Sequence, residues 1–337
     1  MAENRTTLQA IADALGISKV TVSRALKGQS GVSEDLRRRV QDLSRDMGYM
    51  KEKLRTEAKT LRFAFVTPTR YFLATDNFYQ TIYYHLNDLC HEASLDLSVF
   101  VIPPDEEAGA KLPPRLCAEE PDGVFLGGEM GETFIKGLVE IGAPLVSIDF
   151  AGLRESVDSV VVDNFRLGEA AARYLLGRGY KRIGFVGGRA YSSNVADRYY
   201  GYRKVLDQAG LPPEEAWLID NADHSTGHYT LDFPLPPVMP EAFVCHCDRA
   251  AYYAIQRLRS EGFRVPEDVA MVSFDNTELA SSCQPTLTSF DISKKRFADE
   301  AFHLMRERLD GYSGSARRVY LESAIVERES APLAAAP

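Results

Sequence analysis

A short basic segment near the N-terminus carries residue types suited to binding a polyanion. In "GISKVTVSRALKG", residues 16–28, helical spacing places the basic and the apolar residues on different faces. Arginine can pair bidentately with guanine, and valine can pack on a thymine methyl group. Lys19 and Val20 stand at the start of this helix and Arg24 one turn later, so they are candidates for contacts with DNA bases. The alternative is a packing module with ordinary surface charge.

Three charged residues elsewhere in the chain stand where a binding site would place them. Asp149, in "VSIDF", and Asp275, in "VSFDN", each end a predicted strand. A carboxylate there can accept two hydrogen bonds from sugar hydroxyls, although the position of Asp275 also suits a helix cap or a turn. Arg198, in "ADRYYGY", opens a predicted helix beside Asp197, with which it can form a surface salt bridge; the family resemblance described below implies a ligand contact instead.

Other patterns argue against metal and catalytic chemistry. "CHC", residues 245–247, has no second Cys/His pair at zinc-finger spacing, and neighbouring residues on a strand point to opposite faces. "GFVGGR" lacks the Gly-Lys-Ser/Thr of a phosphate-binding loop, and the sequence has no nucleophile elbow or helix-borne zinc motif. We therefore expect neither an enzyme nor a bound metal or cofactor.

The basic segment is positioned by a small group of helices. "TTLQAIADALG" predicts a helix capped by Thr6 or Thr7, after which Gly16 reverses the chain. Ser18 opens the second helix and Ser33 caps a third. Three short helices with a tight turn between the first two are typical of a helix-turn-helix, whose second helix enters the major groove of DNA.

The charge of the chain is unevenly distributed. The 337 residues carry a formal net charge of −9, yet residues 1–62 hold 13 Lys and Arg against 8 Asp and Glu, a charge of +5, which leaves −14 for the rest. A small basic head on an acidic body predicts a polyanion partner for the head only.

Beyond residue 62, short β-branched or aromatic runs alternate with helical stretches. Alternation of this kind predicts parallel, doubly wound sheets, which bind ligands beyond the carboxyl ends of their strands. The predicted strands are 62–67, 96–102, 122–127, 144–149, 182–187, 242–246 and 269–274. The predicted helices are 77–94, 164–178, 197–210 and 248–261.

Membrane insertion and export are not indicated by the sequence. No run of 18 apolar residues occurs, and the N-terminus has no basic start followed by an apolar core. The five cysteines are scattered, which predicts reduced thiols. We expect a cytoplasmic, nucleoid-associated protein without membrane contact.

These segments resemble a known family. "TLQAIADALGISKVTVSRALKGQSGVSEDLRRRVQDLSRDMGYM" is similar to the N-terminal domain of the LacI/GalR (lactose-repressor) family. Blocks such as "APLVSIDF", "SSNVADRYYGYRKVLDQAGL" and "VPEDVAMVSFDNTELA" resemble the family's body, and the resemblance covers essentially the whole chain. It implies a small all-α helix-turn-helix head plus an α/β body of two periplasmic-binding-protein-like lobes with doubly wound parallel sheets.

The resemblance also implies the domain boundaries. The head comprises residues 1–50, the hinge or linker 51–61, and the effector-binding and dimerisation domain 62–337. The lobes of that domain are residues 62–161 with 291–320, and residues 162–290 with 321–337.

For the head, the resemblance implies base contacts from Lys19, Val20 and Arg24. It implies backbone or phosphate contacts from Thr7, Ser18, Thr21, Ser23 and Ser33.

The hinge departs from the family pattern. In the family a hinge helix inserts a leucine into the minor groove, a wedge that kinks DNA. Here the Pro-Asn pair that usually precedes this helix is absent, and Leu54, the best candidate for the wedge, comes about one turn early. The alternative is a plain linker with Leu54 packed on the body.

For the body, the resemblance implies a cleft that binds a small effector. The implied effector-binding residues are Phe78, Tyr79, Asp149, Asn194, Arg198, His224, Cys247 and Asp275. Phe78 and Tyr79 are equally compatible with an ordinary core. Cys247 stands where the family often has an asparagine that binds a sugar, which indicates an effector with fewer hydroxyls there or with another orientation.

The function that follows is a ligand-responsive, sequence-specific transcription regulator, normally a repressor. We expect a homodimer, or a tetramer, on a pseudopalindromic double-stranded DNA operator. The expected effector is a sugar or sugar derivative, with a purine or nucleobase as the alternative. A solute-binding protein for transport would share the body but not the head.

Overall fold

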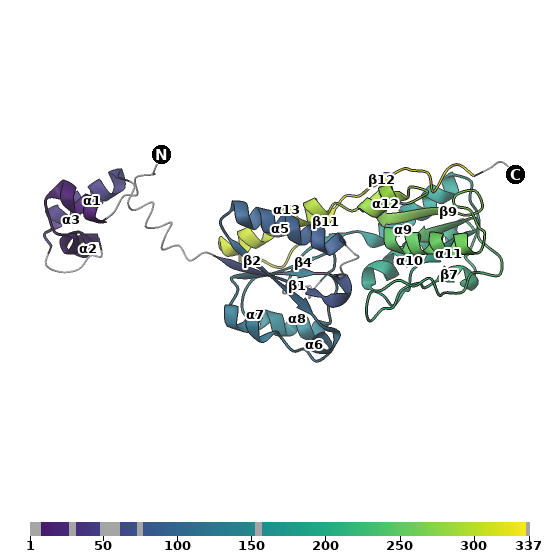
Figure 1. Cartoon of the computed structure of the whole chain (residues 1–337), viewed down its shortest axis with the longest axis horizontal. Coiled ribbons are helices and arrows are strands. Elements are labelled where there is room, and N and C mark those ends of the chain that lie inside the picture. Colours follow the sequence, from purple (N-terminus) through teal and green to yellow (C-terminus); the bar gives the residue numbers. More distant parts are fainter. Residues whose placement is uncertain (1–7, 27–31, 48–60, 73–76, 152–156, 335–337) are drawn as a thin grey trace. The chain divides into compact units, whose positions relative to one another are not determined.

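The computed structural model describes residues 8–26, 32–47, 61–72, 77–151 and 157–334. The chain divides into two compact units, Met1–Thr60 and Leu61–Pro337, shown in Figure 1, and we describe each by itself. None of the helices in the described ranges is long and apolar enough to cross a membrane.

The first unit is a three-helix head. Its helices are α1 (Leu8–Leu15), α2 (Lys19–Leu26) and α3 (Glu34–Asp46). Each helix turns an apolar face to a shared core, in which Ile11, Ala12, Val22, Ala25 and Val40 are buried. The predicted helix-turn-helix is therefore confirmed.

The second unit is an α/β body built on two six-stranded sheets. The first sheet is entirely parallel, in the order β11-β5-β4-β3-β1-β2. The second has the order β12-β10-β9-β8-β6-β7 and is parallel except for the antiparallel pair of β10 and β12. The predicted fold class is confirmed.

Most central strands are buried along their whole length, as expected for parallel sheets covered on both faces. Those of the first sheet are β1 (Arg62–Pro68), β2 (Asp96–Ile102), β3 (Gly123–Gly127), β4 (Leu145–Ile148), β5 (Asp158–Val162) and β11 (Arg318–Leu321). Those of the second are β6 (Ile183–Val186), β7 (Leu218–Ile219), β8 (Ala242–Cys245), β9 (Ala270–Asp275), β10 (Thr288–Asp291) and β12 (Ala324–Val326).

Helices cover the sheets in layers (Figure 1). The longer ones are α5 (Phe78–Glu92), α8 (Glu132–Val139), α9 (Asn164–Gly177), α10 (Ser193–Gln208), α11 (Asp248–Ser260) and α13 (Lys294–Leu309). The shorter ones are α6 (Pro104–Ala108), α7 (Pro114–Glu119), α12 (Glu278–Ser282) and the 3-10 turns η1 (Thr69–Tyr71) and η2 (Glu215–Trp217).

Alternating side chains assign each helix layer to one face of its sheet. In β1, Phe63 and Phe65 pack in the core beneath α5 and α13, whereas Ala64 and Val66 pack on the opposite face with α7 and α8. In the second sheet, one face packs against α9 and α10 and the other against α11. Both sheets are thus sandwiched, and each is the centre of one lobe.

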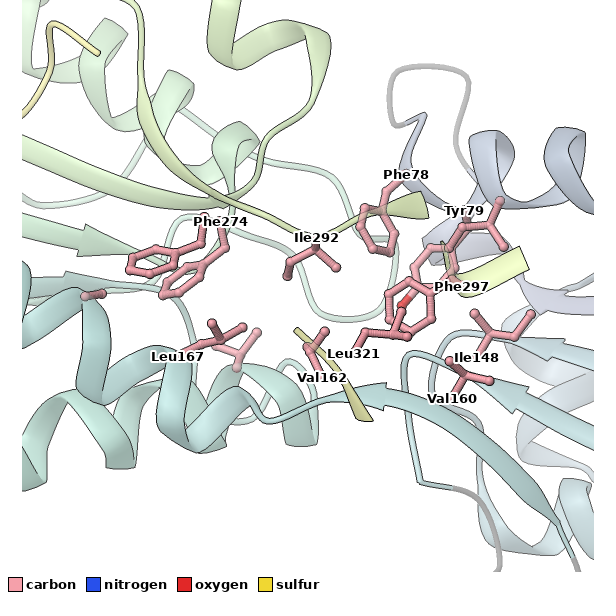
Figure 2. Close-up of a cluster of buried hydrophobic side chains, with 14 of the residues drawn as sticks. Phe78, Tyr79, Ile148, Val160, Val162, Leu167, Phe274, Ile292, Phe297 and Leu321 are labelled. Carbon is pink, nitrogen blue, oxygen red and sulfur yellow. The ribbon is translucent and has the colours of Figure 1, made fainter. Parts of the chain in front are cut away.

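Three crossover segments join the lobes. The chain passes from β5 to α9, from β10 back to α13, and from β11 to β12. Figure 2 shows that Val162, Ile292 and Leu321, one from each crossover, lie between Leu167 and Phe274 on one side and the first lobe on the other. This apolar cluster positions the carboxyl ends of the two sets of strands toward one another.

The helix predicted over residues 197–210 is longer than expected. It begins at Ser193, because the side chain of Ser192 accepts a hydrogen bond from the Val195 amide at 3.3 Å and caps the first turn. Arg198 therefore lies in the second turn of α10 and does not open the helix, which corrects the sequence prediction.

Candidate functional site

The turn before α2 sets the direction of that helix. Gly16 has φ +66°, and the Ile17 amide donates to the Ala12 carbonyl at 3.0 Å. Ser18 then caps α2, since its hydroxyl accepts a hydrogen bond from the Thr21 amide at 3.0 Å and lies 2.7 Å from the Thr21 hydroxyl. The hydroxyl of Ser33 caps α3 in the same way, accepting from the Leu36 amide at 3.3 Å.

This geometry leaves one face of α2 exposed. Lys19, Val20 and Arg24 are exposed, with 61% of the surface of Val20 accessible to solvent. Thr21 and Ser23 are half-buried. An exposed valine between two exposed basic side chains fits the requirements of base contact in a major groove.

Two predicted DNA-binding residues, Thr7 and Leu54, lie outside the described residues.

The body has a cleft between its lobes, with a cavity volume of about 70 Å³. The first lobe lines it with Tyr71, Phe78, Tyr79, Glu129 and Asp149, and the second with Tyr191, Ser192, Asn194, Val195, Arg198, Tyr229, His246, Cys247 and Asp275. Seven of the eight predicted effector-binding residues are therefore brought together.

His224 is the predicted residue that does not line the cavity. Its ring meets that of Tyr191, a cavity residue, edge-on with centroids 5.6 Å apart, and its Nε2 is 2.8 Å from an Asp220 carboxylate oxygen.

Asp149 has an unsatisfied carboxylate oxygen at the cleft. It directly follows β4 with φ +66°, and its side chain is buried. The Tyr79 hydroxyl donates to Oδ2 at 2.8 Å, and the Asn194 amide donates to the Asp149 main-chain carbonyl at 2.6 Å. Oδ1 is buried without a hydrogen-bond partner. Burial raises the pKa of Asp149 to about 6, although Arg198 and the Tyr79 hydrogen bond oppose the rise.

Arg198 is held rigidly at the floor of the cleft. Its Nε donates to the Asn164 side-chain oxygen at 2.7 Å, and Nη1 donates to the main-chain oxygen of His246. The guanidinium lies 4.7 Å from the centre of the Phe274 ring, and Nη1 is 3.7 Å from Asp275 Oδ1. Arg198 is thus preorganised for a bound molecule.

Asp275 is positioned by the end of β9. Its φ is +96°, and Lys294 Nζ donates to its main-chain oxygen at 2.6 Å. Burial raises the pKa of Asp275, an effect that Arg198 opposes and the nearby carboxylate of Asp248 reinforces.

A second polar group in the cleft joins Tyr229, His246 and Cys247. The Tyr229 hydroxyl lies 3.1 Å from His246 Nε2 and 3.2 Å from Cys247 Sγ, and its ring stacks on the imidazole. Burial lowers the pKa of His246 to about 3, so the imidazole is neutral at physiological pH. Cys247 Sγ also accepts from the Ala250 amide at 3.3 Å and caps α11.

Aromatic rings form a continuous wall. Tyr71 lies 5.2 Å from Tyr79 and 6.4 Å from Tyr191, and Tyr191 lies 5.6 Å from His246, measured between ring centroids. Sequence reasoning missed Tyr71 and Tyr191, as well as Glu129. The available signal was their position just beyond the carboxyl ends of β1, β6 and β3.

Polar contacts also join the two lobes across the cleft. Glu129, which follows β3, accepts hydrogen bonds from the Ser193 amide at 2.6 Å and the Ser193 hydroxyl at 2.9 Å. The hydrogen bond from Asn194 to Asp149 spans the same gap. The start of α10 is therefore tied to the strand ends of the first lobe.

A helix-turn-helix head on a two-lobed α/β body with a polar, aromatic-lined cleft defines the class of ligand-responsive DNA-binding regulators. Two family models match the chain: bacterial regulatory proteins of the lacI family over residues 7–52, and a periplasmic binding protein-like domain over residues 172–331. The chain belongs to the LacI family, and is a DNA-binding transcriptional regulator with an effector-binding body.

Individual relatives agree with this assignment over almost the full length. The HTH-type transcriptional regulator DegA of Bacillus subtilis is 25% identical to this chain, and the alignment covers 97% of this chain and 98% of DegA. The repressor PurR of Actinobacillus pleuropneumoniae serotype 3 is 23% identical over 90% of this chain and 91% of its own.

Solved structures have the same fold. The transcriptional regulator CelR in complex with cellobiose is 25% identical with a TM-score of 0.67, covering 97% of this chain and all of that one. The lac repressor dimer bound to operator and an anti-inducer is 17% identical with a TM-score of 0.65, and covers 98% of this chain.

Proposed function

We propose that this chain is a dimeric repressor whose two α2 helices read a pseudopalindromic operator. Lys19, Val20 and Arg24 contact base edges, and the capping serines Ser18 and Ser33, with Thr21 and Ser23, hold the DNA backbone. The exposure of Lys19, Val20 and Arg24 on α2, which follows a fixed turn, supports this assignment. The two-fold symmetry of a dimer matches that of the operator.

We further propose that the effector is a neutral carbohydrate. The observation that carries this proposal is Asp149 Oδ1, a buried acceptor that no hydrogen bond satisfies. A ligand hydroxyl donates the missing bond, which removes the free-energy cost of leaving that oxygen unpaired. The neighbouring Asp275 and Arg198 supply further acceptors and donors for hydroxyl groups.

The charge of the cleft argues for a neutral ligand over an anionic one. Among the described residues that line the cavity are three carboxylates, Glu129, Asp149 and Asp275, and one guanidinium, that of Arg198, which already faces Asp275. A phosphate or carboxylate on the ligand would be buried among these carboxylates, and no described lining residue offers it a further cation, which is energetically unfavourable.

A purine base is the alternative effector. The aromatic wall around Tyr71 and Tyr191 offers faces on which a base can stack, and several relatives carry the name PurR. A purine would place fewer hydroxyl donors against the carboxylates of the cleft than a sugar does.

A thermal-shift screen separates these effectors. A ligand that binds the folded state raises the apparent melting temperature with its concentration. We expect one or more neutral sugars to do so, and matching sugar phosphates to have no effect. Stabilisation by hypoxanthine or guanine with none by sugars would overturn the carbohydrate assignment in favour of the purine one.

A further inference from the structure

A second cavity adjoins the cleft. It has a volume of about 450 Å³, against about 70 Å³ for the inner cavity already described. Cys247 and Asp275 line both cavities, so the two share a wall. The first lobe contributes Asn77 to the outer cavity, and the second contributes the starts of α11 and α12.

The outer cavity continues the aromatic lining of the inner one. Tyr253 lies 5.7 Å from Tyr229, a residue of the inner cavity, and Tyr252 lies 5.8 Å from Tyr253, measured between ring centroids. Tyrosine rings present an apolar face together with a polar hydroxyl, which suits the faces and edges of pyranose rings.

The polar wall of the outer cavity is anchored in the core. The Thr277 amide and hydroxyl donate to the carboxylate of Asp248 at 2.7 and 2.9 Å. The other oxygen of Asp248, which is fully buried, accepts from the hydroxyls of Ser273 and Ser289 at 2.6 and 2.7 Å. Thr277 is consequently fixed beside Asp275, and the wall between the two cavities is preorganised.

Resting on the carbohydrate effector proposed above, we propose that the ligand spans both cavities and contains at least two sugar units. The inner cavity lies far below the roughly 300–1,000 Å³ of common ligand sites, whereas the outer one falls within that range. One terminal unit binds at Asp149 and Arg198, and the next unit packs on Tyr252 and Tyr253.

The test compares monosaccharides with disaccharides built from them. Glucose is titrated against cellobiose, maltose, trehalose and sucrose, and galactose against lactose, with binding followed by calorimetry on the full chain. We expect one disaccharide to bind at least tenfold more tightly than its monosaccharide. If the best disaccharide binds no more tightly than its monosaccharide, the two-cavity inference is wrong while the carbohydrate effector stands. If no sugar binds, both proposals fail.

A variant that blocks the outer cavity tests whether the second sugar unit binds there. Ser282 is exposed and lines the outer cavity, so Ser282→Phe fills that cavity without disturbing the core. Ser281→Phe is the matched control, because Ser281 is also exposed and is not among the residues that line the cavity. We expect Ser282→Phe to weaken the disaccharide about tenfold or more and the monosaccharide by less than about twofold. Equal disaccharide affinity in the two variants would overturn the inference.

Discussion

At the scale of single residues, the cleft is defined by two carboxylates in left-handed backbone conformations. Asp149 and Asp275 have φ +66° and +96°, a region that aspartate enters more readily than most residues. Asp149 directly follows β4, and Asp275 is the last residue of β9. The Tyr79 hydroxyl donates to the carboxylate of Asp149, and Arg198 lies 3.7 Å from the carboxylate of Asp275. Asp149 retains one oxygen without a partner, which is a cost to folding that a ligand removes.

The raised pKa of Asp149 gives a pH-dependent stability. The folded chain holds the proton with a pKa of about 6 against an ordinary value of 3.8, so the contribution is fully present below pH 3.8 and is lost as pH rises through 6. Asp149→Asn keeps the shape and cannot ionise. We expect the unfolding free energy of the variant, relative to wild type, to rise by about 1–3 kcal/mol between pH 4 and pH 7.

Chemical denaturation of the two ligand-free proteins across this pH range measures the difference directly. Asp275 titrates in both proteins, but the charge of Asp149 helps to raise the pKa of Asp275. Removing that charge lowers the pKa of Asp275 and therefore adds to the expected difference in the same direction. A difference that does not change with pH would show that Asp149 has an ordinary pKa in the folded chain.

Much of the cleft could be predicted from the sequence, because residues that end strands are recognisable. Asp149 and Asp275 were found in this way. Tyr229 was missed because it lies in the loop between β7 and β8, where no periodicity indicates a direction. The sequence around His246 suggests only a metal ligand, because the stacking of His246 on Tyr229 depends on tertiary packing that the sequence does not display.

At the scale of elements, one buried ion pair fixes α13 to the first sheet. Arg308 of α13 donates from Nε and Nη2 to the two carboxylate oxygens of Asp158 in β5, at 2.6 and 2.8 Å. The Asp158 side chain is fully buried. Burial alone would raise the pKa of Asp158. Hydrogen bonds from Arg308 and from the Arg317 main chain outweigh this effect and keep the pKa of Asp158 below its ordinary value.

Removing one partner of this pair is expected to be costly. Arg308→Ala leaves the Asp158 carboxylate buried without its counter-ion, so we expect a loss of about 3–5 kcal/mol in unfolding free energy. Lys295→Ala, which removes the exposed pair with Asp299 on the same helix, is the control and should cost less than about 0.5 kcal/mol. Similar effects of the two substitutions in urea unfolding would contradict the structural role of the buried pair.

The elements predicted best were those with a strong pattern. All seven predicted strands form, because each is an apolar run bounded by turn residues. The five strands that were not predicted, β5, β7, β10, β11 and β12, are two to five residues long. They are recognisable only through their partners in the sheets, and β11 and β12 are paired with strands far away in the sequence.

At the scale of the whole molecule, the uneven distribution of charge favours DNA binding by the head and disfavours it for the body, where the proposed effector site lies. The head region carries +5 and the rest of the chain −14, so DNA attracts the head and repels the body. The effector cleft lies in the body, between lobes joined by three crossovers and by the contacts of Glu129 and Asn194. In the proposed dimer, the ligand controls operator binding if it shifts the equilibrium between lobe arrangements that differ in operator affinity.

The most direct test is the operator affinity of the full chain, with and without the sugar identified by the screen. Fluorescence anisotropy on a palindromic fragment from the promoter region of its own gene gives this affinity at several salt concentrations. We predict that the sugar changes the wild-type Kd by about fivefold or more. Arg198→Ala should bind the operator like wild type and not respond, while Arg24→Ala should lose about tenfold or more in operator affinity and still bind the sugar. An unchanged response in Arg198→Ala, or unchanged operator affinity in Arg24→Ala, would contradict the account.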